Sequence, residues 1–238
     1  MGIKKKPLAV ATISFIRNKE EERVVFKTIR ILSLLGIPVI IADGGSLPKQ
    51  KKFIRSLPNI TLLEEKGLTQ QLKASFRKGA AIADSLFYLQ TDKLDFVERH
   101  ASNFIAHYLN SNSKGMLIPV RSEASFNSYP NYQRKTEEFL NFIISSYCGK
   151  TTDYYYGPKI FSTQLVKYLT QLNKDIKWGI EAYFYAINYR LSLPMDFYNV
   201  NIKAPKEILF DEFEFKKYRL ELVQWQTEGL IQGHTVKL

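Results

Sequence analysis

The chain has 238 residues, of which 45% are hydrophobic and 24% are charged, the composition of a globular protein with one sizeable core. This composition excludes disordered, collagen-like and disulfide-rich chains, and the longest nearly uninterrupted apolar run, residues 34–42, has about half of the roughly 20 residues that a membrane-spanning helix requires. Lys and Arg number 34 against 23 Asp and Glu, so the net charge of +11 favours an anionic partner: nucleic acid, an anionic membrane surface or a phosphorylated small substrate. A solvated basic surface explains the same charge without a partner.

The N-terminus combines lysines at 4–6 with an apolar run at 8–16, which imitates a signal peptide. Mostly charged residues at 17–20 occupy the place where a cleavage site with small residues should lie, so we interpret the apolar run as a buried strand. The single cysteine, Cys148, cannot form an internal disulfide, which fits a reducing compartment. We therefore expect a cytoplasmic protein.

Strands and helices alternate through the first hundred residues. Short apolar runs predict strands at 8–15, 37–42 and 60–63, and hydrophobic residues spaced by three and four predict helices at 20–35 and 68–83. Further strands are expected at 85–90 and 115–120, and further helices at 97–110, 136–147, 162–172, 179–189 and 212–229. Because this alternation requires right-handed crossovers, we predict an α/β fold with a mainly parallel sheet flanked by helices.

The chain contains no internal repeat and no flexible linker, so we expect one domain with halves at about 8–110 and 111–238. Ligands of parallel sheets gather beyond the carboxyl ends of the strands. The segments after the predicted strand ends, 14–19, 43–46 and 90–95, are therefore the first candidates for a site.

The sequence Asp43-Gly44-Gly45-Ser46 follows a predicted strand and places one carboxylate beside flexible backbone. Such a carboxylate can accept hydrogen bonds from ribose hydroxyls or from a base amide. A tight turn closed by the Asp43 side chain explains the same residues.

The sequence Gln90-Thr91-Asp92 ends the next apolar strand, and Asp95 follows it. A carboxylate at such a strand end can hold Mg²⁺ or Mn²⁺, which neutralises a diphosphate. A helix cap made by Asp92 or Asp95 is the alternative.

Taken together, these segments resemble the nucleotide-diphospho-sugar glycosyltransferases of the GT-A fold, particularly the family-two-like group. The first strand and its loop correspond to residues 11–22, the second strand with its Asp-Gly-Ser type turn to 39–46, and the strand that ends in Asp-x-Asp to 87–92. Residues 67–79 resemble the helix that precedes the metal-binding strand. The resemblance covers residues 8–96 and implies a GT-A (Rossmann-like) sheet followed by an acceptor-side C-terminal half.

The resemblance also implies roles for single residues. Asp43 would contact the nucleoside, Lys73 or Arg77 the nucleotide side, and Asp92 a Mg²⁺ or Mn²⁺ ion. The residues that we assign to donor binding are Ser14, Arg17, Asp43, Gly44, Lys73, Arg77 and Gln90.

One residue departs from the pattern of the family. The first carboxylate of Asp-x-Asp is Gln90 in this chain. Metal binding is therefore expected to be weaker, to shift to Asp95, or to be replaced by basic side chains such as Arg17 and Lys93.

The sequence Trp178-Gly179-Ile180-Glu181 begins a predicted helix. In the resembled family an acidic residue at such a helix start lies near the acceptor, which implies that Glu181 takes the proton of the acceptor hydroxyl as a general base. Electrostatic stabilisation of the helix N-terminus explains Glu181 equally well.

Most of the tyrosines and both tryptophans lie in the second half of the chain. Among them, Tyr156 and Trp178 are expected to contact the acceptor sugar, and Lys159 is expected to bind the acceptor or a phosphate. Core packing is the alternative explanation for these aromatic side chains.

The function that we expect is the transfer of a sugar from a nucleotide-diphospho-sugar to an unknown hydroxyl acceptor, catalysed by a hexosyltransferase. A basic nucleic-acid-binding protein and a catalytically silent GT-A relative are the alternatives. A nucleotidyltransferase is disfavoured because the first loop lacks the Gly-rich, Arg-containing signature of that group. We do not expect nucleic acid as the partner, since no recognition helix or single-strand-binding pattern is present, whereas peripheral association with an anionic membrane is compatible with the charge.

Overall fold

The structure is a computed structural model that describes residues 5–111, 115–205 and 213–238. Its internal contacts group the chain into two compact units. Unit 1 consists of Met1–Met116 and Pro158–Leu169, and unit 2 consists of Leu117–Gly157 and Thr170–Leu238. The expectation of a single domain stays a prediction.

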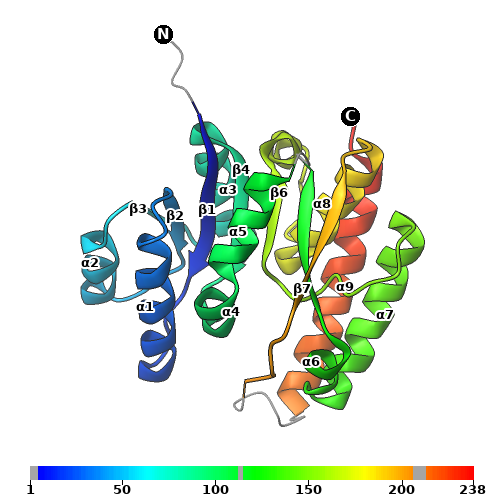
Figure 1. The fold of residues 1–238 in the computed structure, drawn as a ribbon, viewed down its shortest axis with the longest axis horizontal. Helices are drawn as coiled ribbons and strands as arrows, with labels where there is room; N and C mark the ends of the chain where they lie inside the picture. Colours follow the sequence, from blue (N-terminus) through cyan, green and yellow to red (C-terminus); the bar gives the residue numbers. More distant parts are fainter. Residues whose placement is uncertain (1–4, 112–114, 206–212) are drawn as a thin grey trace. The chain divides into compact units, whose positions relative to one another are not determined.

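In the described residues seven strands form one mixed, mostly parallel sheet with the order β3-β2-β1-β4-β6-β5-β7. Figure 1 labels the unit 1 strands β3, β2, β1, β4 and β6 in this order. The seven strands are β1 Lys6–Ser14, β2 Val39–Asp43, β3 Ile60–Glu64, β4 Ala83–Gln90, β5 Met116–Arg121, β6 Lys159–Ser162 and β7 Met195–Val200. Strand β1 pairs in parallel with β2 and β4, β2 pairs in parallel with β3, and β6 runs antiparallel to β4. The predicted α/β fold with a mainly parallel sheet is confirmed.

The central strands of unit 1 are buried along almost their whole length. Residues 8–14 of β1 and all five residues of β2 are buried, as expected for parallel strands that are covered on both faces. Strand β3 lies at the end of the strand order, and none of its residues is fully buried. The continuous apolar runs in the sequence are therefore the central strands.

The helices of unit 1 join these strands. They are α1 Lys19–Ser33, α2 Pro48–Ser56, α3 Leu68–Ile82, α4 Leu94–Arg99 and α5 Ala101–Asn110, followed by the 3₁₀ helix η1, Thr163–Thr170, whose last residue belongs to unit 2. The Asn18 side chain caps α1 by accepting a hydrogen bond from the Glu21 N–H at 2.9 Å, and Gly36 beyond the helix has φ of 71°. Helix α3 packs against β1, β2 and β4, whereas α1 packs against α4.

Several elements differ from the sequence prediction. The helix expected over 97–110 is two helices, because the backbone leaves the helical conformation at His100, and the segment 162–172 forms η1 rather than an α-helix. The sequence analysis missed four short elements: α2, β6, β7 and the helix α6, Glu123–Asn127. With at most nine residues each, they are too short for hydrophobic periodicity to identify.

Unit 2 is dominated by three long helices. These are α7 Asn131–Cys148, α8 Ile180–Arg190 and α9 Phe213–Thr235, and the 3₁₀ helix η2, Lys177–Gly179, leads into α8. Residues 180–188 of α8 are all buried, so this helix is the centre of the unit. The last helix was expected from residue 212, which lies outside the described residues.

Helix α9 meets the backbones of η2 and α8 because it carries two glycines four residues apart. A Cβ atom at Gly229 would overlap the carbonyl group of Gly179, and a Cβ at Gly233 would lie 2.5 Å from the Tyr183 carbonyl oxygen. Only hydrogen atoms fit at these two positions, so the glycines set the distance between the helices.

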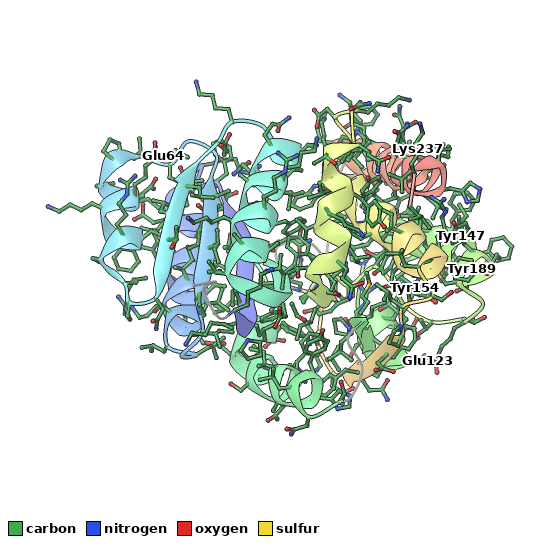
Figure 2. All side chains as sticks on the ribbon, turned by 90° about the horizontal axis from the view of Figure 1, so that it is seen from above. Glu64, Glu123, Tyr147, Tyr154, Tyr189 and Lys237 are labelled. Atoms are coloured by element: carbon green, nitrogen blue, oxygen red, sulfur yellow. The ribbon has the colours of Figure 1, made fainter. Side chains whose placement is uncertain are left out.

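Aromatic contacts join the carboxyl ends of α7 and α8. The rings of Tyr147 and Tyr189, which Figure 2 labels, have centroids 5.0 Å apart, and the Tyr147 hydroxyl lies 2.9 Å from Nδ1 of His234. Much of the aromatic enrichment of the second half of the chain is therefore packing, the alternative considered for it above.

Candidate functional site

The ends of three parallel strands bring the first candidate residues together. In the register of the sheet Ser14 is the partner of Asp43, and Ile13 is the partner of Gln90. Because these strands are parallel, residues 14–17, 43–46 and 90–93 follow them at the same edge of the sheet. We call these three segments the carboxyl rim.

The Asp43 carboxylate is buried, and it accepts hydrogen bonds from its own loop and from the end of β1. Its Oδ1 accepts from the hydroxyls of Ser14 at 2.8 Å and Ser46 at 2.5 Å. Its Oδ2 accepts from the backbone N–H groups of Gly45 at 3.0 Å and Ser46 at 2.9 Å. Asp43 therefore closes the tight turn considered above, and its contact with a nucleoside stays a prediction.

A lysine from α2 reaches the same carboxylate. The Lys51 ammonium lies 3.9 Å from Asp43 Oδ2 and 2.7 Å from Glu64 Oε2. Hydrogen bonds from Lys51 and then from Arg55 lower the pKa of the Glu64 carboxyl, which Figure 2 labels. Lys51 thus joins the end of β2 to the end of β3.

Gln71 in α3 joins the ends of β1 and β2 by hydrogen bonds. The sequence did not identify it as a residue of the site. Its side-chain amide donates to the carbonyl oxygens of Ser14 at 3.1 Å and Ala42 at 2.9 Å. The amide passes within about 3 Å of where a Cβ of Gly44 would lie, so the glycine leaves room for it. A polar residue at a buried position of an amphipathic helix is the sequence signal that would have identified it.

The turn after β4 presents the one exposed carboxylate of the carboxyl rim. The Asp92 side chain is 66% exposed, and its Oδ2 lies 3.3 Å from the Lys93 ammonium. The Lys93 backbone N–H donates to the Gln90 carbonyl oxygen at 3.1 Å, which fixes the turn. Thr91 ties the same turn to β1, because its hydroxyl donates to the Ile13 carbonyl oxygen at 3.2 Å.

Other predicted donor residues lie at different distances from the carboxyl rim. Arg17 belongs to it but binds Glu21, with 2.5 Å between Nη2 and Oε1. Lys73 and Arg77 lie on α3, where Arg77 is nine residues beyond Leu68, or about 14 Å along the axis. Arg77 instead donates to the Leu169 carbonyl oxygen at 3.4 Å, so the structure does not bring it to the carboxyl rim.

The side chains at the carboxyl rim do not by themselves form a cluster of metal ligands. Mg²⁺ and Mn²⁺ take oxygen ligands, usually including one or two carboxylates. Gln90 supplies an amide in place of the first carboxylate, Asp95 binds Arg99 at 2.7 Å, and Asp92 has the Lys93 ammonium beside it. In the part of the chain that the structure describes, no cluster of three or more His, Cys, Asp or Glu side chains is arranged to hold an ion.

Lys159, expected at the acceptor, belongs to β6 of unit 1. It is paired with Tyr88 of β4, it is 1% exposed, and its ammonium lies 5.9 Å from the centroid of the Tyr88 ring. The structure thus buries this side chain in the sheet, and its acceptor role stays a prediction.

Unit 2 places the other acceptor candidates around the start of α8. Glu181 is 5% exposed in the first turn of the helix, and the Trp178 carbonyl oxygen accepts from the Gln226 amide at 2.9 Å. Burial, and after it the negative charge of Glu181, raises the pKa values of Tyr155 and Tyr185 well above the usual value for tyrosine. Two neutral phenols therefore lie close to the Glu181 carboxylate.

A buried ion network beside these residues was also missed by the sequence analysis. Arg121 at the end of β5 binds Asp153 through Nε at 2.7 Å and Glu137 through Nη2 at 2.6 Å, and Arg219 of α9 binds Glu137 at 3.0 Å. The Arg121 side chain is 1% exposed. Coulombic attraction to the two carboxylates overcomes desolvation and raises the pKa of the guanidinium. No local sequence pattern reveals such a network, because its members come from distant elements.

Tyr156 packs on this network. The Arg121 guanidinium lies 5.5 Å from the centroid of the Tyr156 ring and 4.6 Å from that of Tyr129. Tyr156 is 5% exposed, so packing accounts for most of its surface, and its contact with an acceptor stays a prediction.

The net charge is confined to one unit. Unit 1 has 21 Lys and Arg against 10 Asp and Glu, a net charge of +11, whereas unit 2 has 13 of each and is neutral. The basic charge therefore accompanies the carboxyl rim. In the described residues no helix combines the length and the apolar character needed to span a membrane.

Solved structures of a glycosyltransferase share this fold. Glucosyl-3-phosphoglycerate synthase of Mycobacterium tuberculosis matches with a TM-score of 0.64 and 14% identity, covering 94% of this chain and 80% of that chain. The same enzyme in complex with Mn²⁺, UDP-glucose and phosphoglyceric acid matches with a TM-score of 0.66 and 13% identity, covering 94% of this chain and 79% of that one. Its complex with Mg²⁺ and UDP matches with a TM-score of 0.61 and 14% identity, covering 92% of this chain and 79% of that one.

At this identity the likeness shows the fold alone. It confirms the GT-A-like architecture and, at the level of the fold, the resemblance to nucleotide-sugar glycosyltransferases. No protein-family model and no curated protein sequence matches the chain.

Proposed function

We propose that this protein is a glycosyltransferase that moves a sugar from a nucleotide-diphosphate donor to a hydroxyl acceptor. The observation that carries the proposal is the carboxyl rim, where residues 14–17, 43–46 and 90–93 follow parallel strands of a GT-A-like fold in a unit of net charge +11. Clefts beyond such strand ends bind nucleotides in other α/β folds, and positive charge attracts a diphosphate.

The nucleoside binds, in this proposal, beside the turn that Asp43 closes. Phe15 is 53% exposed next to this turn, with its ring 3.6 Å from where a Cβ of Gly45 would lie. An exposed aromatic ring there offers a face on which a base can stack. The hydrogen bonds of Asp43 hold the loop that carries Gly44 and Gly45, so that the backbone C=O groups of these glycines meet the nucleoside in a fixed geometry.

The chemical step uses Glu181 as the base. The acceptor hydroxyl attacks the anomeric carbon of the donor sugar, the bond from that carbon to the diphosphate oxygen breaks, and the hydroxyl proton passes to the Glu181 carboxylate. The neutral Tyr155 and Tyr185 add no negative charge beside this base. In this proposal, Asp92 and Lys93 act at the diphosphate of the donor.

A ligand panel tests the donor half of the proposal. The thermal unfolding midpoint is measured with UDP-, GDP- and dTDP-sugars, because a ligand that binds the native state raises it. UDP-glucose is the first candidate, since the mycobacterial structure of the same fold holds it. One of these donors is expected to raise the midpoint by several degrees. Stabilisation by oligonucleotides alone, sensitive to salt, would instead support a nucleic-acid-binding protein.

Two substitutions test the chemical half. Asp92→Asn is expected to reduce transfer strongly with little effect on folding, because its side chain is 66% exposed. Glu181→Gln is expected to lower turnover by about 100-fold or more while donor affinity stays the same. Unchanged turnover in Glu181→Gln would make Glu181 a structural residue that stabilises the start of α8.

A further inference from the structure

We propose that unit 2 contains a second ligand site, a cavity that binds a small anionic molecule with a ring and a hydroxyl group. The cavity has a volume of about 330 Å³ and is bordered by the ends of α7 and α8, by the segments that follow these helices and by β7. Cavities of this size hold small-molecule ligands in other proteins. Asn188, which lines it, lies seven residues beyond Glu181 on α8, or about 10 Å along the axis, so the cavity is separate from the proposed base.

A lysine supplies positive charge to this cavity. Gly149, with φ of 78°, ends α7, and the Tyr154 hydroxyl donates to the Lys150 carbonyl oxygen at 2.7 Å, which fixes the backbone at Lys150. The Lys150 ammonium lies 3.9 Å from the centroid of the Phe197 ring, and among the described residues it pairs with no carboxylate. Its three N–H groups can therefore bind an anionic oxygen while the contact with the ring remains.

The side chain of Asn188 supplies a buried hydrogen-bond acceptor. Its Nδ2 donates to the Leu193 carbonyl oxygen at 3.0 Å, which determines the end of the amide that carries the oxygen. Asn188 is 0% exposed, and within the described ranges no protein group donates to its Oδ1. A buried acceptor without a donor raises the energy of the folded protein. Since Asn188 lines the cavity, a ligand hydroxyl can provide the donor.

Much of the remaining lining is apolar or aromatic. Met195 and Phe197 are two residues apart on β7 and therefore project from the same face of the strand. Figure 2 labels two further lining residues, Tyr154 and Tyr189, of which Tyr189 is 51% exposed. Such surfaces pack against an aromatic ring or against the apolar face of a sugar ring. The chemistry that fits the cavity is therefore a ring with one anionic group and at least one hydroxyl, which a phenolic acid and a sugar acid share.

Ser192 occupies a backbone conformation that glycine adopts with less strain. It lies two residues beyond the end of α8 with φ of 52°, and its N–H donates to the Tyr189 carbonyl oxygen at 2.9 Å. Non-glycine residues with positive φ are frequent at functional sites, where the side chain compensates for the strain. The serine places a hydroxyl on the lining of the cavity, where glycine would place none.

Calorimetric titration with 4-hydroxybenzoate and with glucuronate tests the proposal and distinguishes the two sources of this chemistry. At least one of the two is expected to bind with a dissociation constant of about 1 mM or tighter. The neutral analogues 4-hydroxybenzamide and glucose should bind about tenfold more weakly, because a charge-assisted hydrogen bond is lost. For the phenolic acid, benzoate should show a similar loss, because it has no hydroxyl to donate to Asn188.

Three variants connect the binding to named side chains. Lys150→Met should weaken binding of the bound probe by about tenfold, whereas Lys150→Arg, which keeps the charge, should retain most of the affinity. Lys217→Met removes an exposed lysine of α9 that does not line the cavity, and it should leave binding unchanged. Ser192→Gly should weaken binding without lowering the thermal unfolding midpoint, since glycine relieves the backbone strain.

The single cysteine reports where the probe binds. Cys148 lines the cavity, so a saturating probe should slow its labelling by iodoacetamide at pH 9 by about fivefold or more. Binding that Lys150→Met weakens and that protects Cys148 supports the proposal. No binding of either probe, full affinity in Lys150→Met, or unchanged labelling of Cys148 would each overturn it. The glycosyltransferase proposal is tested with nucleotide sugars and does not depend on these results.

Discussion

The Ser14 hydroxyl donates to the Asp43 carboxylate over 2.8 Å and thereby joins the ends of β1 and β2. Both side chains are 1% exposed, so this contact forms in the interior of unit 1. It holds the start of the loop that carries Gly44 and Gly45, which the proposed nucleoside site requires.

Asp43→Asn should destabilise the protein. An amide could place its NH₂ group opposite the Ser14 and Ser46 hydroxyls, which can turn and accept, while its oxygen keeps the Gly45 and Ser46 N–H groups. The four hydrogen bonds then lose their charged acceptor, and because bonds to a charged group are stronger than neutral ones, the free energy of unfolding in urea should fall by about 2 kcal/mol. The milder Ser14→Ala should lower it by about 1 kcal/mol. A wild-type value for Asp43→Asn would show that the loop rearranges freely.

Arg121→Met should be more damaging, because it leaves the buried carboxylates of Asp153 and Glu137 without their shared cation. Breaking a buried ion pair by removal of one partner costs about 3–5 kcal/mol, and urea denaturation measures the loss. Lys135→Met is the matched control, since Lys135 pairs with Glu138 on the exposed face of α7. That variant should stay within about 0.5 kcal/mol of wild type. Equal effects of the two substitutions would contradict the structural role of the network.

Gly229→Ala should destabilise unit 2 even though alanine is the better helix former. Propensity alone predicts a gain of about 1 kcal/mol, whereas a methyl group would overlap the Gly179 carbonyl and force α9 away from the end of η2. We expect a net loss of about 3 kcal/mol in thermal or urea unfolding. Gln224→Ala, on an exposed position of α9, should change stability by less than about 0.5 kcal/mol. A gain in stability in Gly229→Ala would contradict the close packing of these helices.

Cys148 should react slowly with thiol reagents. Burial raises the pKa of its thiol to about 11, so at pH 8 the reactive thiolate is scarcer than in a free cysteine by roughly 100-fold. Because the shift is upward, labelling by a thiol reagent should accelerate as the pH rises from 8 toward 10 and should reach the free-cysteine rate in denaturant. Equal rates in the folded and denatured protein would show that the thiol is exposed.

Several features could be read from the amino-acid pattern because they depend on local order. The apolar runs that became β1 and β2 and the three-and-four spacing in α1 and α3 are properties of consecutive residues. The break at His100 could not be read in this way, because apolar residues continue on both sides of it. Strand β6 was missed because four residues carry no periodicity, and its place antiparallel to β4 is a long-range pairing.

The sequence by itself determined the α/β alternation, the basic charge and the positions of the loops that end the parallel strands. Only the tertiary structure decided what those loop side chains contact: Asp43 is enclosed by its own turn, Arg77 lies well along α3, and Lys159 is buried in the sheet. The reason is that hydrophobic periodicity depends on neighbours in the chain, whereas hydrogen bonds and ion pairs depend on neighbours in space. Gln71 reaches the Ala42 carbonyl oxygen, 29 positions earlier in the chain, only when α3 packs against β2.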